Sequence, residues 1–322
     1  MDPLLDINSL RVDFQSGGRR IPAVRDVSLG VARGECLGIV GESGSGKTQL
    51  FMAALGLLPA AAAAAGSVRF RGVELLGAPA ALLNSVRGSK FTMIFQDPMS
   101  SLTPHLRIGV QMAEVLVCHA GLSWRDAERA ALDMLRRVRI ADPERRLRQF
   151  PHELSGGMRQ RVVIGMSLLC EPELVIADEP TTALDVTVQA GIVGLLREMR
   201  HDYGTGMVLI SHDLGVVAGL ADRIMVMYAG RIVESGGAAD LLRSPLHPYA
   251  EALIACIPPL QGPLPERLMT LPGQPPAAGE AVTGCAFALR CPRASARCAA
   301  DPPQLRVLGA GREAACHHPA DA

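Results

Sequence analysis

The stretch Gly41-Glu42-Ser43-Gly44-Ser45-Gly46-Lys47-Thr48 decides the fold of this chain. The apolar run 36–40 before it predicts a buried strand, and a helical pattern begins near Lys47. Together they give the G-x-x-x-x-G-K-[ST] phosphate loop in its strand–turn–helix setting. The glycines permit backbone conformations that are closed to other residues, so successive N–H groups can converge on phosphate oxygens.

Polar groups at the start of the helix complete the predicted phosphate site. Lys47 supplies a mobile positive charge for the β- and γ-phosphates, and Thr48 offers a hydroxyl to Mg²⁺. The helix dipole adds positive potential at the same place. The alternative is a glycine-rich turn that binds nothing. The loop alone leaves many nucleotide-binding classes open, so the rest of the chain must discriminate among them.

Composition bounds the possibilities. The 322 residues allow one large domain with an extension, or two modest domains. Lys+Arg and Asp+Glu are balanced at 32 each, so we expect no nucleic-acid partner. Hydrophobic residues reach 48% but aromatic residues only 3%, which predicts a core built from Ala, Val, Leu, Ile and Met.

The sequence predicts no membrane span. The longest apolar run, 50–66, contains Pro59 and is shorter than the roughly 18–20 residues that a span needs. We interpret it as a helix that ends at Pro59, followed by a connector of small residues. The first residues lack a signal-peptide pattern, so we expect a cytosolic protein whose eight cysteines are mostly reduced unless they hold a metal.

Short apolar runs and turn signals in residues 4–40 predict an antiparallel β layer, and a second strand pair is predicted at 68–70 and 73–75. Phe14 lies on the first strand of this layer. It either stacks on a purine ring or packs in the core, because aromatic residues serve both purposes.

Polar side chains follow three further buried-strand runs, at 91–95, 174–177 and 207–210. Gln96 can reach a metal or an attacking water, or cap a turn. Asp178 can hold the Mg²⁺ shell, and Glu179 can polarise a water for attack on the γ-phosphate, although paired acids in loops are usually only solvated. His212 is interpreted as a γ-phosphate sensor rather than a structural histidine. A last strand, 224–228, and the Gly230 turn are predicted to complete the core.

A helical insert is predicted from about 107 to 170. Within it, Ser155 is a good N-cap, and Gly156 and Gly157 expose the first N–H groups of the next helix. This makes a second anion-binding end without a lysine of its own, which suggests use in trans. The alternative is an ordinary capped helix. Asp185 is predicted to cap a later helix, 186–201.

The ordered motifs resemble those of the nucleotide-binding subunit of ATP-binding-cassette (ABC) transporters, over roughly residues 5–255. The resemblance implies an α/β P-loop NTPase: a RecA-like core, an antiparallel β layer and a helical subdomain at about 100–170, within a nucleotide-binding domain at 1–255. It implies that two cassettes pair head to tail, with ATP between one phosphate loop and the partner's signature, residues 154–158.

The resemblance also implies residue roles. Glu179 is the expected general base, His212 contacts the γ-phosphate, and Asp185 links the two sites of the pair. Mg²⁺ would be held by Thr48, Gln96 and Asp178. The candidate ATP-binding set is Gly41, Glu42, Ser43, Gly44, Ser45, Gly46, Lys47, Thr48, Gln96, Asp178, Ser155, Gly156, Gly157, Asp185 and Phe14.

Narrower features resemble the dipeptide/oligopeptide importers, notably residues 154–161, 181–185 and 244–249. Met158 resembles the "D" type of ATPase, which pairs with a distinct "F" type. This implies an ATPase peripheral to the cytoplasmic face of the inner membrane, with two transmembrane permease subunits and an extracytoplasmic solute-binding protein. Nickel and glutathione importers share much of the pattern. Thr48, Thr103 and the alanines at 60–65 depart from it without removing a group needed for hydrolysis.

The segment 256–322 is predicted to be a small Cys-rich extension. A Pro-rich connector starts at 258, and Cys285, Cys291, Cys298 and Cys316 follow. Four thiols in so short a segment suggest a metal staple, either iron–sulfur or zinc, or else free or paired thiols. The string 284–292 resembles the peptide-importer tail, which is associated with a [4Fe–4S] cluster, although Leu289 replaces a usual proline. His317 and His318 could replace a thiol as ligand, but they are interpreted as solvated tail residues. Cysteines 36, 118, 170 and 256 are interpreted as core.

Two other classes of protein remain as alternatives. A soluble ABC ATPase of DNA repair, chromosome structure or translation would need a long coiled coil or two phosphate loops, and the chain shows neither pattern. An iron–sulfur redox sensor with a secondary ATPase would be expected to carry another redox motif. The ATPase of a peptide importer is therefore the favoured interpretation.

Overall fold

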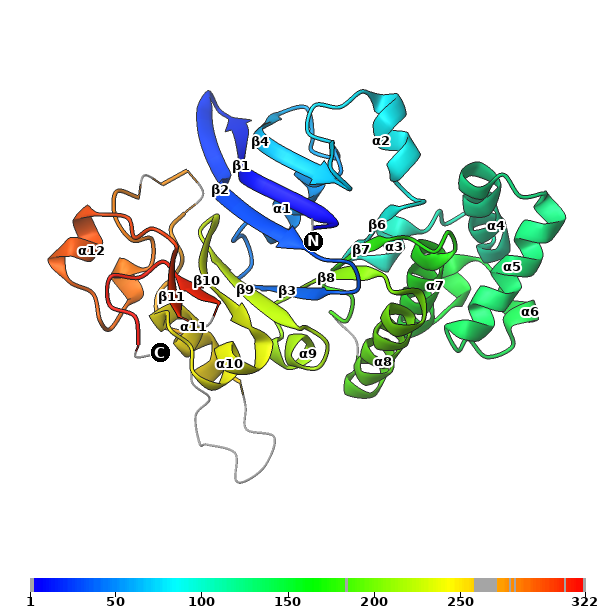
Figure 1. The fold of residues 1–322 in the computed structure, drawn as a ribbon. Coiled ribbons are helices and arrows are strands. Elements are labelled where there is room, and N and C mark those ends of the chain that lie inside the picture. The colour runs from blue at the N-terminus through cyan, green and yellow to red at the C-terminus, as the bar shows by residue number, and fades with distance from the viewer. Residues whose placement is uncertain are drawn as a thin grey trace. The chain divides into compact units, whose positions relative to one another are not determined.

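The computed structural model describes residues 3–182, 185–257, 271–277, 279–280, 282–309 and 311–320. The chain divides into two compact units, and each is described by itself (Figure 1). The first comprises residues 1–31, 36–77 and 210–322, and the second residues 32–35 and 78–209. The predicted Pro-rich connector lies mostly at 258–270, outside the described residues.

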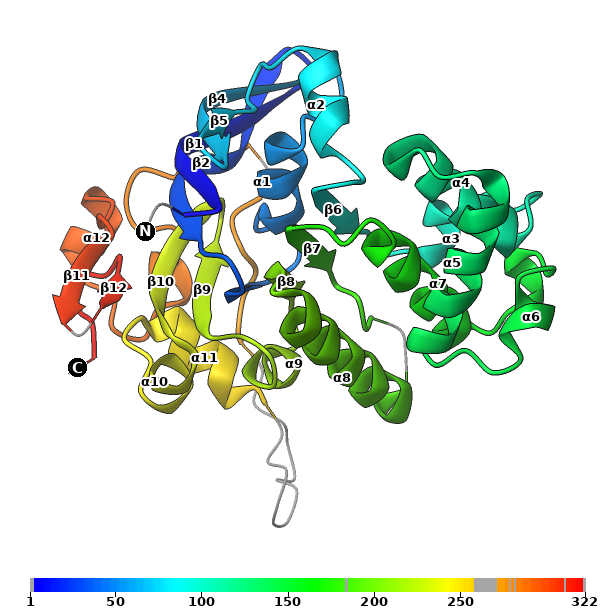
Figure 2. The ribbon, with the colours of Figure 1, turned by 45° about the vertical axis from the view of Figure 1, so that its right-hand side comes forward.

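A four-stranded antiparallel sheet of order β2-β1-β4-β5 forms one layer of the first unit. Its strands are β1 (Leu5–Ser16), β2 (Arg19–Val31), β4 (Ala62–Phe70) and β5 (Val73–Glu74). Gly17 and Gly18 turn β1 into β2 with φ of 55° and 72°, which suits glycine. Figure 2 shows helix α1 (Lys47–Ala54) close to this sheet, and it contacts β1 and β2. The predicted antiparallel layer is confirmed.

The connector predicted after Pro59 is wrong in part, because Ala62–Ala65 form the first half of β4. Phe14 pairs with Ala62 and Arg11 with Ala65, so β1 supplies backbone hydrogen-bond partners along the run. Exposure alternates along these alanines, as the two faces of a strand require. Pairing with β1 thus overrides the helical preference of alanine, which is a weak local effect.

A second sheet region in the first unit has the order β11-β12-β10-β9-β3. Its strands are β3 (Cys36–Val40), β9 (Arg223–Tyr228), β10 (Arg231–Gly237), β11 (Arg306–Gly309) and β12 (Arg312–Ala314). Strands β3 and β9 run parallel, whereas β10 is antiparallel to both β9 and β12. The prediction that the core ends at the Gly230 turn is therefore wrong, because the C-terminal segment returns and adds two strands beyond β10. The helices of this part are α9 (Leu214–Ala218), α10 (Ala238–Arg243), α11 (Pro248–Ala255), η2 (Ala288–Arg290) and α12 (Ala296–Ala300).

The core of the first unit is mainly aliphatic, as composition predicts, but an aromatic cluster lies within it. Tyr228, Tyr249 and Phe287 are each at most 1% exposed, and their ring centroids lie 4.5–5.4 Å apart. Tyr228 ends β9, Tyr249 begins α11 and Phe287 precedes η2, so the cluster joins the sheet to the C-terminal extension. Aromatic pairs at such distances stabilise beyond the area that they bury.

His247 beside this cluster makes stability depend on pH. Its ring is 1% exposed, and Nδ1 accepts the Tyr249 N–H at 3.0 Å, so the folded protein requires the neutral ring. Burial lowers the pKa of His247 from 6.5 to about 4. Between these values only the unfolded chain takes up the proton, so the free energy of unfolding should fall by about 3 kcal/mol as pH drops through this window.

His247→Asn keeps an N-cap acceptor without a titrating ring, so its unfolding free energy should vary less with pH than that of wild type. Urea denaturation of both proteins at about pH 7 and about pH 4.5 measures the difference. The neighbouring Glu234, whose pKa is raised by burial, acts in the opposite direction in both proteins and cancels in the comparison. Parallel pH profiles of the two proteins would contradict the assignment.

The second unit holds three strands of the central sheet and the helices before and between them. The strand order is β8-β7-β6, with β6 (Phe91–Ile94), β7 (Leu174–Asp178) and β8 (Gly206–Ser211). The last two residues of β8 belong to the first unit. Strand β6 pairs with β7 in parallel. The helices are α2 (Ala80–Val86), α3 (Pro98–Ser101), α4 (Ile108–Ala120), α5 (Trp124–Arg137), α6 (Pro143–Arg146), η1 (Pro151–Glu153), α7 (Gly156–Leu168) and α8 (Val186–Tyr203).

The helical pattern predicted for 107–170 is confirmed, and α4, α5 and α7 pack together (Figure 1). Gly121 ends α4 in the left-handed region with φ of 66°, and Ser123 caps α5 by accepting the Asp126 N–H. Among the described residues, no helix combines the length and apolar character that a membrane crossing needs.

The prediction that Cys118 is a core residue is wrong, because its side chain is exposed on α4. Met112 and Leu116 mark the buried face of this helix. Residues two positions apart do not share a helical face, so Cys118 points away from the face that Leu116 buries. Of the other cysteines interpreted as core, Cys36 is buried, and Cys170 and Cys256 are half-buried.

Candidate functional site

The phosphate loop lies between β3 and α1 in the first unit, as predicted. Gly41 and Gly46 have φ of 155° and 97°, and a Cβ atom at these positions would lie 2.1 Å from the Met227 carbonyl oxygen and 2.3 Å from the Ala23 carbonyl oxygen. Only glycine fits so close to neighbouring backbone. The turn is therefore held against β2 and β9 while Ser43 and Gly44 remain exposed to a ligand.

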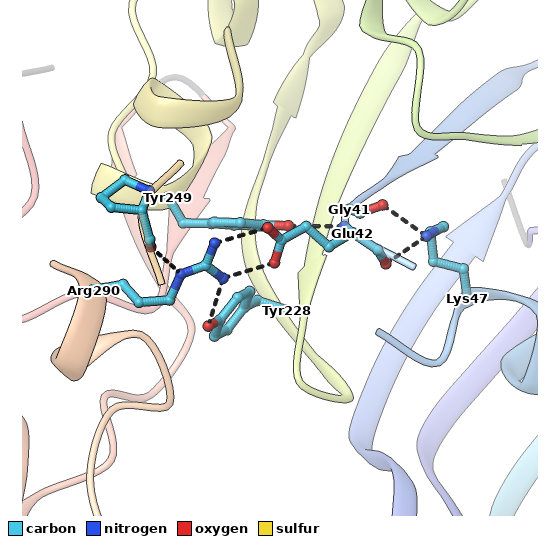
Figure 3. A network of polar contacts seen from close by, with 7 residues as sticks. Gly41, Glu42, Lys47, Tyr228, Tyr249 and Arg290 are labelled. Carbon is cyan, nitrogen blue, oxygen red and sulfur yellow. Dashed lines mark hydrogen bonds and ion pairs between the residues drawn. The ribbon is translucent and has the colours of Figure 1, made fainter. Parts of the chain in front are cut away.

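Lys47 is the first residue of α1, and its side chain bends back into the loop. Its Nζ donates to the carbonyl oxygens of Gly41 at 2.7 Å and Glu42 at 2.9 Å, and the residue is 6% exposed (Figure 3). The ammonium group is thus fixed at the centre of the turn, where a phosphate would meet it. Thr48 follows as the second residue of the helix.

Glu42 is tied to the C-terminal extension. Both carboxylate oxygens accept hydrogen bonds from Arg290, and the Glu42 N–H donates to the Tyr249 hydroxyl at 2.9 Å (Figure 3). Sequence reasoning placed Glu42 among the ATP-binding residues and missed Arg290 and Tyr249. No local pattern could have found them, because Glu42 and Arg290 lie 248 positions apart.

Two further candidates, His212 and Phe14, lie in the first unit. His212 is exposed immediately after β8, and the next residue, Asp213, caps α9 through the N–H groups of Gly215 and Val216. Phe14 is half-buried on β1, opposite Ile21 of β2. Whether Phe14 stacks on a base or packs against the sheet stays a prediction.

The second unit brings Gln96 and Glu179 together. Glu179 Oε2 accepts hydrogen bonds from Gln96 Nε2 and Thr182 Oγ1, both at 2.9 Å. Glu179 has φ of 47°, an unusual conformation for a non-glycine residue, and a turn bond from the Thr182 N–H to its carbonyl oxygen accompanies it. Asp178, at the end of β7, is 3% exposed. Thr182 was missed as a Glu179 partner by sequence reasoning.

The signature segment, residues 154–158, presents a helix end to solvent. Ser155 Oγ accepts the Met158 N–H at 3.4 Å, and both Ser155 and Gly156 are exposed, whereas Leu154 is buried beneath them. Asp185 is exposed as well and caps α8 by accepting the Val188 N–H at 2.9 Å. Both predicted caps are confirmed.

The cysteines of the extension line one small pocket. Cys285, Cys291, Cys298 and Cys316 share it with His317 and His318. Burial raises the pKa of the Cys285, Cys291 and Cys316 thiols, and the neighbouring cysteines of the pocket raise it further. Among the described residues, no group of three or more His, Cys, Asp or Glu side chains is arranged to hold a single metal ion.

The interpretation of His317 as a solvated residue is wrong. Its side chain is 7% exposed, and Nε2 lies 2.8 Å from the Asp301 carbonyl oxygen, to which it is placed to donate. Strand β12 pairs with β10 shortly before His317, which holds the chain end against the rest of the unit. His318 is exposed, with Nε2 2.8 Å from Ser295 Oγ.

Two family models match separate parts of the chain. The ABC transporter family model matches residues 24–182, and the model of the oligopeptide/dipeptide transporter C-terminal region matches residues 233–298. The oligopeptide transport ATP-binding protein OppD of Salmonella typhimurium is 47% identical over 318 residues, with 99% of this chain and 94% of that protein covered. The chain belongs to the oligopeptide ABC transporter ATP-binding family.

Other members and structures agree with this placement. OppD of Haemophilus influenzae is 48% identical and covers 94% of this chain and 93% of its own length. The dimeric cassette MJ0796, solved in a post-hydrolysis state with ADP and Pi, has a TM-score of 0.65 at 26% identity and covers 73% of this chain and 98% of its own. The ABC cassette fold and ATPase activity predicted from the motifs are thereby confirmed.

Proposed function

We propose that this ABC ATPase powers the import of di- and oligopeptides across the cytoplasmic membrane. The observation that carries the proposal is the near full-length similarity to oligopeptide transport ATP-binding proteins, which includes the separate match to the C-terminal region of that family. In this view residues 1–255 form the nucleotide-binding domain, with its helical subdomain at about 100–170, and residues 256–322 form the importer-specific extension.

The proposed nucleotide chemistry follows from the two local clusters. Lys47, Thr48 and the loop N–H groups would bind the ATP phosphates, and Thr48, Gln96 and Asp178 would hold Mg²⁺. Glu179 takes the proton of the attacking water, and His212 contacts the γ-phosphate. The hydrogen bonds from Gln96 and Thr182 support this role, because they fix one oxygen of Glu179 and orient the carboxylate.

We further propose that the protein acts with a second ATPase subunit. The exposed N–H end at Ser155 and Gly156 carries no lysine, which suits a phosphate bound to a partner's loop. The expected partner is a distinct F-type ATPase, and Asp185 links the two sites. Two permease subunits at the cytoplasmic face of the membrane and an extracytoplasmic solute-binding protein complete the proposed importer.

We propose that the cysteine pocket holds a [4Fe–4S] cluster rather than zinc. Four cysteines line the pocket, which suits either metal, and the resemblance of residues 284–292 to the peptide-importer tail favours the cluster. The raised thiol pKa values mean that thiolates are costly there without a positive partner, and a bound metal would offset that cost. When bound, the cluster would cross-link Cys285, Cys291, Cys298 and Cys316.

Protein purified without oxygen should therefore be brown and contain iron, and Cys298→Ser should lose most of both. Cys298 is 6% exposed and lines the pocket, whereas Cys118 is exposed on α4, so Cys118→Ser is the matched control. Absorption spectra and elemental analysis measure the outcome. A colourless wild-type protein that contains zinc would overturn the assignment.

Transport itself is tested by reconstitution. The ATPase, its F-type mate and the two permeases are placed in vesicles with the solute-binding protein, and uptake of labelled short peptides is compared with uptake of nickel and glutathione. Peptide uptake that needs ATP supports the proposal. Uptake of nickel or glutathione without peptide would replace the cargo, and failure to assemble with any permease would contradict the transport role.

A further inference from the structure

Arg290 makes a two-pronged contact with the phosphate loop. Its Nη1 donates to Glu42 Oε2 at 2.8 Å and its Nη2 to Glu42 Oε1 at 2.9 Å, in the fork geometry that binds carboxylates most specifically (Figure 3). The Arg290 side chain is 5% exposed and that of Glu42 26%. This pair is therefore shielded from water, unlike the surface ion pairs that contribute little.

Arg290 is itself held from several sides. Its Nε donates to the Pro272 carbonyl oxygen at 2.9 Å, and Nη1 also donates to the Tyr228 hydroxyl at 3.2 Å. The guanidinium carbon lies 5.8 Å from the centre of the Tyr228 ring and 5.9 Å from that of Phe287. Because Arg290 is restrained in this way, the position of η2 fixes the position of the Glu42 carboxylate.

The hydrogen bonds of Glu42 also restrain the loop atoms that would contact the nucleotide. The Glu42 N–H donates to the Tyr249 hydroxyl, and the Glu42 carbonyl oxygen accepts from Lys47 Nζ, so the whole residue is fixed between α11 and the loop lysine. Gly41, before it, lies against the Met227 backbone and cannot shift in that direction. The orientation of the Glu42 peptide unit consequently sets the place of Lys47.

We infer that Arg290 is a positioning residue for ATP binding, which acts through Glu42 to hold the phosphate loop and Lys47 in their binding geometry. The inference rests on the proposed nucleotide site. Without Arg290 the Glu42 carboxylate would lose both hydrogen-bond donors of the guanidinium group. ATP would then have to order the loop as it binds, and the free energy of ordering would be subtracted from the free energy of binding. The effect should therefore appear in affinity rather than in the chemical step.

The test compares ATP affinity and turnover in the full chain. Arg290→Met should weaken ATP binding about tenfold, with kcat at saturating ATP within about twofold of wild type. Arg290→Lys keeps the positive charge but cannot donate to both carboxylate oxygens as arginine does, so it should also weaken ATP binding. This second variant tests the inference if Arg290→Met does not fold. Arg293→Met is the matched control, since Arg293 forms an ion pair with exposed Glu251 at 2.7 Å, and it should bind ATP normally.

A double-mutant cycle separates positioning from general damage. Glu42→Gln should weaken binding, and Glu42→Gln with Arg290→Met should be no weaker than the poorer single variant, because the two residues act as one unit. Affinity within about twofold of wild type in folded Arg290→Met and Arg290→Lys, or additive effects in the cycle, would overturn the inference. Lys47→Ala is the reference variant. If Lys47→Ala binds ATP normally, the proposed nucleotide site is refuted. If Lys47→Ala loses ATP binding while Arg290→Met keeps it, only the positioning role of Arg290 is refuted.

Discussion

The Glu179→Gln protein should bind ATP as wild type does and hydrolyse it about 10²–10⁴-fold more slowly, because removing a general base has effects of this size. Glutamine preserves the shape of the side chain and one carbonyl oxygen that Gln96 and Thr182 can still donate to. What it loses is the negative charge that takes a proton from water. Binding and chemistry should thus separate.

Two measurements establish the separation. Equilibrium ATP binding gives the affinity, and single-turnover hydrolysis gives the rate of the chemical step. If the signature of one subunit closes on the loop of another, ATP should also trap the variant in a stable pair with its partner ATPase, visible by gel filtration. Glu171→Gln, an exposed glutamate of the same unit, is the matched control and should behave as wild type. Normal steady-state hydrolysis by Glu179→Gln would refute its role as base.

The Lys47→Ala protein should lose tight ATP binding, with hydrolysis reduced about 10²–10³-fold, the usual cost of removing one preorganised charge or donor. The structure gives the reason, because Lys47 Nζ is already fixed by the Gly41 and Glu42 carbonyl oxygens and needs little reordering to meet a phosphate. Alanine also frees those two oxygens inside the loop, which turns an attractive site into one that repels anions.

The chain offers a clean control for this variant. Lys90, the only other lysine in the sequence, is exposed and lies in the second unit, so Lys90→Ala removes the same charge elsewhere. Titration with a fluorescent ATP analogue should show saturable binding for Lys90→Ala and none for Lys47→Ala at equal nucleotide. Equal affinities in the two variants would contradict the assignment of the loop.

Sequence reasoning succeeded where the determining interactions are local. The phosphate loop, the cap at Ser155 and the cap at Asp185 depend on residues within a few positions of each other, so their patterns carry the geometry. The buried strands were recognisable as continuous apolar runs, which parallel sheets buried on both faces require. The order of these elements then sufficed to recognise the cassette.

The larger failures involve partners distant in the sequence. Pairing with β1 made a strand of the alanine run, and β12 returned to β10 from the chain end. The Glu42–Arg290 pair joins residues whose types are ordinary at their own positions. Nothing in the local pattern distinguishes such an arginine from a solvated one, because its role is created only when the aromatic cluster brings η2 beside the loop.

The return of the chain end has a consequence for biosynthesis. The ribosome synthesises Glu42 early, yet its partner Arg290 lies 248 residues downstream, and β12 follows later still. This contact can therefore form only after almost the whole chain has been translated. Products of premature termination would carry the nucleotide motif without the Arg290 contact that holds it.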